Sequence, residues 1–243
     1  MSPPPAIDHH LETVSIPRRL VSPLLAVHAG TAPSAAELRD LRAGGLVGAA
    51  GLHPLVRSLV EVMTDPSLVV TVETKLSRSS PPLLATFWRH ADVAVVGSRS
   101  GRRNFDLARI DPHLLPFHIA QFVGLVPRPQ PRFDDSVQIL ESALAQAEQH
   151  VATDPVAADA ALAAAGVPPV WIDRLLAALT LRRSTWVVES LWLGGGGRDE
   201  SRLCVLDSGF AGYWRMGNTG QGRITVSPTG FDDVLERIAA LLP

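Results

Sequence analysis

The sequence predicts an α+β fold with a quasi-two-fold internal repeat, in which helices flank a central antiparallel sheet. Three observations support this prediction. Apolar runs with helical spacing and runs with strand alternation occur together in one chain of 243 residues. The order helix–helix–strands–helix occurs twice, and turn-forming residues fall at matching places in both copies. A hydrophobic content of 46% is enough for one compact domain overall.

The first half is predicted over residues 34–126 and opens with two helices. Ser34 followed by Glu37 matches a Ser-x-x-Glu capping box, and the helix ends near Ala43 because two glycines follow. The second helix, Leu52–Met63, has apolar residues at i, i+3, i+4, i+7, i+8 and i+11. This spacing places them on one face of an amphipathic helix.

Strands follow these two helices. In each predicted strand, β-branched and other apolar residues alternate with polar ones, and stretches rich in Pro, Gly and Ser separate the strands. We expect turns at Ser77–Pro82 and Gly97–Gly101, and a short helix at Pro116–Val123. The predicted strands are Leu68–Leu76, Leu83–His90, Asp92–Val96 and Asn104–Ile110.

Two segments lie outside the halves. Residues 1–33 form a leader and a first segment. Over Met1–Glu12 prolines oppose regular structure, so this leader is predicted to be disordered. Leu20–Ala29 is apolar, and its pattern does not distinguish a helix from a strand. Residues 127–152 begin with three prolines at alternate positions, which indicate a linker of polyproline character. A helix is then predicted over Asp134–His150.

The second half, residues 153–243, repeats the order of the first. An Ala-rich helix, Thr153–Ala165, ends at a glycine, and an amphipathic helix around Ile172 and Leu179 follows it. The last helix is Phe231–Leu242. The predicted strands are Thr185–Leu193, Arg202–Asp207, Gly212–Met216 and Arg223–Ser227, with a turn at Gly194–Gly197 after the first of them.

Individual positions of the two halves also correspond. Val-Glu-Thr at 72–74 matches Val-Glu-Ser at 188–190, and Pro112 matches Pro228. The same number of positions separates the members of each match. We therefore expect the two sets of strands to join or pack into one antiparallel sheet.

Composition excludes several classes of protein. The chain has 22 Lys and Arg against 24 Asp and Glu, and this balance argues against a nucleic-acid or anionic-membrane partner. Cys204 is the only cysteine, so no internal disulfide forms. No apolar run approaches the roughly 20 residues of a membrane span, and the N-terminus lacks the apolar core of a signal peptide. We therefore expect a cytoplasmic protein.

Motifs for catalysis are weak. Gly97-Ser98-Arg99-Ser100-Gly101 fits the letters of a nucleophile elbow, but a hairpin turn fits its surroundings better. The glycines at 194–197 lack the lysine of a phosphate loop, and the histidines have no metal-ligand spacing. We predict no catalytic residue, no metal and no cofactor. An enzyme, such as a hydrolase or transferase with an unrecognised site, stays open, as does a winged-helix-like DNA-binding protein.

Tryptophans are concentrated in the second half. Trp186 and Trp192 share one face of their predicted strand, because side chains alternate along a strand, and Trp214 lies on a neighbouring strand. Core packing and an exposed patch for a protein partner are both compatible with this pattern.

The order of patterns along the chain resembles the EspG family, the cytosolic chaperones of ESX (type VII) secretion in actinobacteria. The similar stretches are LHPLVRSLVEVM with the strand SLVVTVET, then CVLDSGFAGYWR, and finally ITVSPTGFDDVLERIAALL. The resemblance covers about Ser34 to the end and implies a quasi-two-fold domain with a central antiparallel sheet. It also implies a chaperone that caps a hydrophobic tip on a secreted helical substrate and keeps it soluble.

The resemblance further implies a partner of the PE–PPE-like or WXG100-like heterodimer type, and no nucleic-acid or membrane partner; the oligomeric state stays open. We expect the second half to carry the partner surface, on the tryptophan face, the hairpin tip and the last helix. The candidate partner-binding residues are Trp186, Trp192, Gly195, Gly196, Arg198, Trp214, Leu235 and Ile238.

Overall fold

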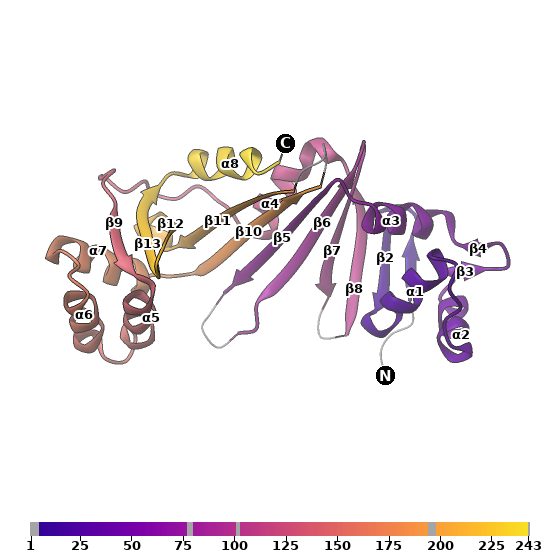
Figure 1. Ribbon diagram of the computed structural model, residues 1–243, viewed down its shortest axis with the longest axis horizontal. Helices are drawn as coiled ribbons and strands as arrows, with labels where there is room; N and C mark the ends of the chain where they lie inside the picture. Colours follow the sequence, from indigo (N-terminus) through magenta and orange to yellow (C-terminus); the bar gives the residue numbers. More distant parts are fainter. Residues whose placement is uncertain (1–4, 77–79, 101–102, 194–197, 243) are drawn as a thin grey trace.

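The computed structural model describes residues 5–76, 80–100, 103–193 and 198–242, which build an 11-stranded antiparallel sheet with helices on both faces (Figure 1). The order of strands across the sheet is β1-β2-β8-β7-β6-β5-β10-β11-β12-β13-β9. The strands are β1 Ala6–Asp8, β2 Thr13–Pro17, β5 Leu68–Lys75, β6 Leu83–His90, β7 Val93–Ser100, β8 Asn104–Ile110, β9 Val137–Leu140, β10 Ser184–Trp192, β11 Asp199–Asp207, β12 Tyr213–Gly220 and β13 Arg223–Thr229.

The pairing of β5 with β10 forms the centre of the sheet and joins the two halves of the chain. In this antiparallel pair Val72 lies opposite Val188 and Leu68 lies opposite Trp192. From the centre the chain continues outward through β6, β7 and β8 on one side, and through β11, β12 and β13 on the other. The predicted central antiparallel sheet with flanking helices is thereby confirmed.

One face of the central strands is covered by α4 (Leu115–Phe122) and α8 (Phe231–Ala240). Alternate residues of β5, from Leu68 to Val72, point to this face and are buried, while the residues between them are not. Leu115, Ile119, Val234 and Ile238 of the two helices pack on them in one hydrophobic cluster. A 3-10 turn, η2 (Pro112–Leu114), leads into α4.

The opposite face is covered at one end by α1 (Val21–His28), α2 (Ala35–Ala43) and α3 (Pro54–Thr64). These helices pack on β2, β7 and β8 in a second cluster that includes Val14, Val95 and Leu107. The side chains of neighbours such as Val95 and Val96 belong to different clusters, as strand alternation requires. The turn η1 (Arg18–Leu20) precedes α1, and a short hairpin, β3 (Val47–Gly48) with β4 (Gly51–Leu52), connects α2 to α3.

The other end of that face is covered by α5 (Glu141–His150), α6 (Pro155–Ala164) and α7 (Pro169–Thr180). They pack on β9, β12 and β13 in a third cluster that contains Trp171 and Trp214. Figure 1 shows the two groups of helices at opposite ends of the sheet, with β5 and β10 between them.

Several predicted elements are confirmed in detail. The capping box of α2 is present: the Glu37 amide donates to Ser34 Oγ (3.3 Å), and the Ser34 amide donates to Glu37 Oε2 (2.9 Å). Strands β5, β6 and β8 lie where alternation predicts them, and α3, α7 and α8 lie where helical spacing predicts them. The tips 77–79 and 194–197, on which two predicted turns fall, lie outside the described residues.

The predicted turn at Gly97–Gly101 is wrong for the part of it that the structure describes. Strand β7 continues through Gly97 to Ser100, whereas Gly101 lies outside the described residues. Gly97 serves packing, because a Cβ there would lie 2.5 Å from the ring of Phe105 and 2.7 Å from that of Trp88. A strand that runs on through Gly97 does not form the strand–turn–helix of a nucleophile elbow.

Two further predictions need correction. The helix predicted over Asp134–His150 begins only at Glu141, because residues 137–140 form strand β9 and pair with β13. The leader predicted as disordered contains β1, which pairs with β2, and β2 pairs in turn with β8. Strand β1 has three residues and β9 has four, which are too few to establish alternation on their own.

The segment Val126–Pro131, here called the proline strap, contains the predicted linker at Pro127–Pro131 and is hydrogen-bonded to the second half. The Tyr213 hydroxyl donates to the Val126 carbonyl (2.7 Å) and accepts from the Val126 amide (3.1 Å). The Arg128 guanidinium donates to both carboxylate oxygens of Asp207, at 3.1 and 2.8 Å, and this pairing raises the pKa of Arg128. Gly212, at φ +80°, leaves room for the strap, since a Cβ there would lie 2.7 Å from the Pro129 oxygen.

Candidate functional site

The face of β10 that carries Trp186 and Trp192 points toward α4 and α8. Trp186 is 1% exposed and belongs to the cluster beneath these helices. Trp192, at the end of the strand, is half-buried and packs at the edge of the same cluster. The two side chains do share a face, but that face is covered, so only Trp192 keeps exposed surface.

Trp214 lies on the other side of the sheet. It is 2% exposed, packs with Trp171 and Phe133, and donates its indole N–H to the Ala211 carbonyl (3.0 Å). In the pairing of β11 with β12, Trp214 lies opposite Leu206, whereas Trp186 pairs with Val205, and neighbours along a strand point to opposite faces. The three tryptophans therefore form no common patch.

The remaining expected residues divide in the same way. Ile238 of α8 is fully buried, and Leu235 of the same helix is partly buried against the same cluster. Arg198 is exposed just before β11, and its Nε donates to Glu200 Oε1 at 2.8 Å. Gly195 and Gly196 lie outside the described residues. Burial removes Trp186, Trp214 and Ile238 from any partner surface in this conformation and leaves Trp192, Arg198 and Leu235.

The open surface of the sheet is on the opposite face of β5, β10 and β11. We call it the open sheet face and define it by Val69, Thr71, Glu189, Leu191 and Arg202, none of which is buried. A cleft of about 490 Å³ runs over these residues. It exists because the two groups of helices stop short of the centre of the sheet (Figure 1).

The open sheet face continues toward α5. A second cleft of about 500 Å³ also contains Arg202 and extends over Cys204 and Met216 to Leu144 and Glu148 of α5. Strand residues thus form the floor of this surface, and a helix of the second half forms one wall. Apolar groups such as Leu191 and Leu144 lie among polar ones on this surface.

Acidic groups predominate along this surface. Glu189 pairs with Arg202, with 3.3 Å between Oε1 and Nε. Glu141 and Glu200 line the two clefts without an ion pair to Arg202. Burial raises the pKa of the Cys204 thiol to about 11, so the thiol stays protonated at neutral pH and does not act as a thiolate nucleophile.

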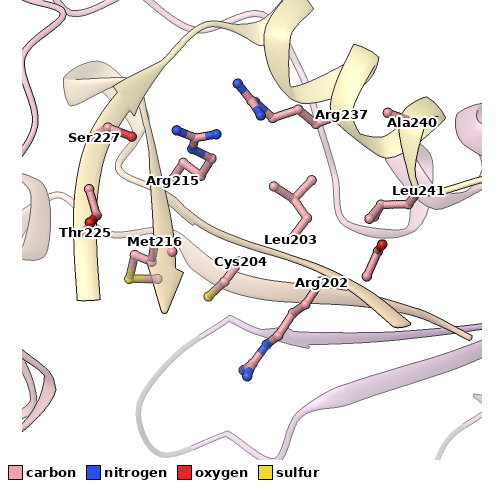
Figure 2. Close-up of a pocket in the computed structure, with 12 residues that line it drawn as sticks. Arg202, Leu203, Cys204, Arg215, Met216, Thr225, Ser227, Arg237, Ala240 and Leu241 are labelled. Atoms are coloured by element: carbon pink, nitrogen blue, oxygen red, sulfur yellow. The ribbon is translucent and has the colours of Figure 1, made fainter. Parts of the chain in front are cut away.

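A cleft of about 460 Å³ lies on the other face, beside α8 (Figure 2). Arg215 and Arg237 reach it from β12 and α8, whereas the guanidinium of Arg202 points to the opposite side of the strands. Asp233 accepts from Arg237 (2.9 Å) and from the Thr229 hydroxyl, and these bonds lower its pKa. This carboxylate holds Arg237 against the helix.

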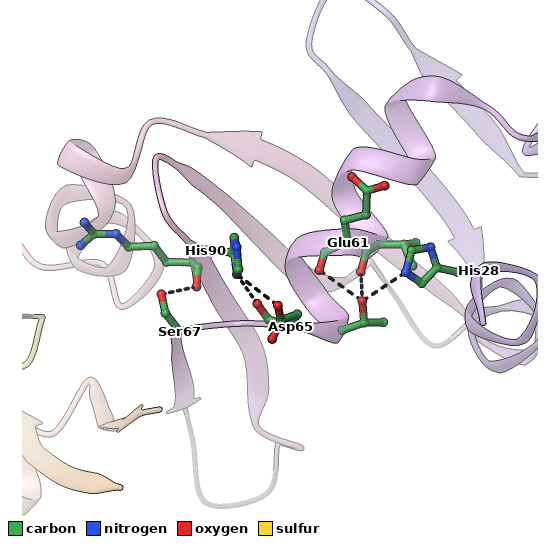
Figure 3. A network of polar contacts seen from close by, with 8 residues as sticks. His28, Glu61, Asp65, Ser67 and His90 are labelled. Carbon is green, nitrogen blue, oxygen red and sulfur yellow. Dashed lines mark hydrogen bonds and ion pairs between the residues drawn. The ribbon is translucent and has the colours of Figure 1, made fainter. Parts of the chain in front are cut away.

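Two histidines, His90 of β6 and His28 of α1, lie at the C-terminal end of α3 (Figure 3). His90 Nδ1 bonds the Asp65 carbonyl and lies 3.8 Å from the Asp65 carboxylate. Thr64 Oγ1 contacts His28 Nε2 at 3.4 Å. Within the described part of the chain, no three His, Cys, Asp or Glu side chains are placed to hold a metal ion.

The hairpins that follow α3 and α7 belong to the large sheet. In a winged helix the hairpin projects as a wing beside an exposed recognition helix, but here α3 buries Val56, Leu59 and Val60 against the sheet. These two helix–hairpin units therefore do not have the arrangement of a winged helix. Over the residues that the structure describes, no helix has the length and apolar character of a membrane span.

Sequence reasoning missed the open sheet face. Glu189 was noted only as a repeat position, and Thr71 and Arg202 only as strand residues. Strand alternation does predict that these side chains share a face, but which face the helices cover depends on distant parts of the chain. The one available signal was the polar character of these positions in strands of a sheet that was predicted to have flanking helices.

Comparison with known proteins supports the fold. A sequence model of the EspG family matches residues 16–240. No curated protein matches the chain in sequence. Among solved structures, the chain is similar to the Mycobacterium tuberculosis type VII secretion system chaperone EspG5, solved in complex with a PE25-PPE41 dimer. The TM-score is 0.63 at 14% identity, over 95% of this chain and 97% of the other.

Proposed function

Because this chain belongs to the EspG family, we propose that it is a chaperone that binds substrates of type VII secretion and keeps them soluble and secretion-competent. The observation that carries the proposal is the family match, which spans nearly the whole chain. The similar solved structure is itself a type VII secretion chaperone in complex with a PE25-PPE41 dimer. The clients of this chain are accordingly helical heterodimers of the PE–PPE-like or WXG100-like type.

The client surface we propose is the open sheet face with the wall formed by α5. A helical tip that exposes apolar side chains finds Leu191 and Val69 at the floor of the cleft and Leu144 at its wall. Polar groups around them, such as Glu189 and Arg202, suit a complex that forms and later separates. Arg198, just before β11, extends this surface toward the β10–β11 end, whereas Trp192 lies on the opposite face of β10 and is not part of it.

Several finer features accompany this function. We propose that the halves 34–126 and 153–243 are related by a quasi-two-fold axis that passes between β5 and β10. The opposition of Val72 and Val188 supports it, because equivalent residues meet at such an axis. We also propose that the protein acts in the cytoplasm by binding alone, without catalysis.

Co-purification with a client tests the function. The chain is co-expressed with a PE–PPE pair from the same genome, and an affinity tag on the chaperone recovers the complex. We expect the client in stoichiometric amount, and a loss of about tenfold with Leu191→Arg, which places a charge in the cleft. The matched control is Phe117→Arg, on the exposed side of α4 on the opposite face.

Circular dichroism and thermal melting show whether both variants are folded. Recovery of no client by the wild-type chain, across the PE–PPE and WXG100-like pairs of the genome, contradicts the chaperone proposal. If Leu191→Arg and Phe117→Arg recover equal amounts of client, the chaperone function stands, but the open sheet face is not the client-binding site.

A further inference from the structure

Phe210 is the most exposed large apolar residue among those that the structure describes, with 83% of its surface open to solvent. It lies in the turn η3 (Gly209–Ala211), which connects β11 to β12. A single exposed apolar side chain is ordinary on a protein surface, but the surroundings of this one are not.

The turn that presents Phe210 is held by hydrogen bonds on both sides. The Gly209 amide donates to Asp207 Oδ1 (2.8 Å), the carboxylate that also binds Arg128 of the proline strap. The Ser208 amide donates to the Gly212 carbonyl (3.0 Å). The Ala211 carbonyl accepts the indole N–H of the buried Trp214. A phenyl ring on so fixed a backbone loses little conformational freedom when a partner binds it.

An apolar cleft of about 270 Å³ lies next to Phe210. Pro129 and Pro131 of the proline strap form one side, and Phe133, Ala177 and Trp214 contribute to the rest. The ring of Phe210 and this cleft together offer one raised and one recessed apolar feature. Large side chains that enter such a recess contribute most of the affinity in protein complexes.

Three arginines lie around Phe210. Arg132 and Arg174 line the cleft, and Arg183 lies beside Gly209, with Nε 3.3 Å from the position of a Cβ there. Arg174 stacks on Phe133 (3.7 Å to the ring centroid) and pairs with Asp135. Within the described ranges, Arg132 and Arg183 have no acidic partner and are exposed, so their guanidinium groups are available to another molecule.

We propose that this surface, formed by Phe210, the apolar cleft, Arg132 and Arg183 and called here the Phe210 patch, binds an acidic segment of a partner protein. The segment carries a large apolar side chain that fills the cleft, and its carboxylates pair with Arg132 and Arg183. Charge complementarity selects this occupant. Acidic Glu189 and Glu200 line the cleft over the open sheet face, and Glu141 lines the adjoining cleft beside α5, so the two surfaces favour different partners.

The test uses the full chain and a fluorescent synthetic peptide of about nine residues in which glutamates surround one phenylalanine. Fluorescence anisotropy measures binding at low and at moderate salt. We expect the peptide to bind at least about tenfold more tightly than its lysine-substituted counterpart, and binding to weaken as salt rises. Phe210→Ser and Arg183→Glu each weaken it at least about fivefold, whereas Phe117→Ser, at another exposed phenylalanine, leaves it unchanged.

Three results overturn the proposal. One is equal affinity for the acidic and the lysine peptide. Another is a dimer in sedimentation of the wild-type chain that Phe210→Ser converts to a monomer, which assigns the patch to a second copy of this chain. The third is loss of the type VII client on Phe210→Ser, which makes the patch part of the client surface. Because client recovery and peptide binding are measured separately, failure of one is distinguishable from failure of the other.

Discussion

Val72 of β5 and Val188 of β10 lie directly opposite each other at the centre of the sheet, and both are fully buried. They come from different halves of the chain and belong to the same cluster under α4 and α8. The hydrophobic core is therefore shared between the halves at this pair, and each half completes the burial of the other.

This shared core predicts that Val72→Ala and Val188→Ala each lower the free energy of unfolding by about 2 kcal/mol, because each leaves a cavity. The double variant departs from additivity by about 0.5 kcal/mol or more, since the two residues are in contact. Guanidinium denaturation measures all three. Val156→Ala, at an exposed position on α6, is the control and changes stability by less than about 0.5 kcal/mol. Strict additivity would contradict a shared cavity.

The contacts of the proline strap predict that Arg128→Leu strongly lowers the free energy of unfolding. This substitution leaves the carboxylate of Asp207, whose side chain is 6% exposed, without its cation, and we expect a loss of about 3 kcal/mol. Arg198→Leu breaks an ion pair with Glu200 whose partners are both more than half exposed, and it costs less than about 1 kcal/mol. Urea denaturation at neutral pH compares the two. Similar losses would show that the strap does not depend on Arg128.

The close packing around Gly97 predicts that a side chain there destabilises the protein. The sequence pattern placed Gly97 in a turn, where a side chain would be tolerated more easily. Gly97→Ala places a methyl group within 3 Å of Phe105 and Trp88, and we expect about 1–3 kcal/mol of destabilisation. Gly217→Ala is the matched control, because Gly217 also lies in a strand and has no atom within 4 Å of an added Cβ. Thermal melting of both variants decides the point, and a stable Gly97→Ala variant would refute the packing role.

The lowered pKa of Asp233 predicts that the stability of the fold depends on pH. Its bond with Arg237, and a second with Thr229, hold its pKa below the usual value. The pKa is thus lower in the folded chain, so the stabilisation is present above about pH 4 and is lost as the pH falls through the folded value. Because both partners are more than a third exposed, Asp233→Asn costs less than about 1 kcal/mol at neutral pH.

Denaturation curves over a range of pH check this. The difference between wild type and Asp233→Asn shrinks toward zero in acid. Asp232→Asn, in the same turn of α8, is the control for the helix dipole. A difference that stays constant with pH would assign the effect of Asp233 to something other than its charge.

The central part of this fold could be predicted because its elements are long enough to show a period. Helix α3 and strand β5 each have a full apolar pattern within their own residues. Strand β9 does not, since four residues fit a helix as well as a strand until β13 supplies the partner. Strand β2 has five residues, and its partner β8 lies far along the chain.

The candidate site depended even more on tertiary contacts. Alternation predicted that Trp186 and Trp192 share a face, and they do. Which face is covered was decided by α4 and α8, which come from other parts of the chain. The exposed groups on the reverse of β10, Glu189 and Leu191, became candidates only once the positions of these helices were known.

The strands at the two edges of the sheet have a consequence for how the protein behaves at high concentration. β1 has three residues and β9 has four, whereas the central strands have eight or nine. A strand from another molecule that added to either edge would gain only a few backbone hydrogen bonds. A sheet that is long at its centre and short at its edges is therefore protected against growth into fibres, although each molecule contains an extensive β-structure.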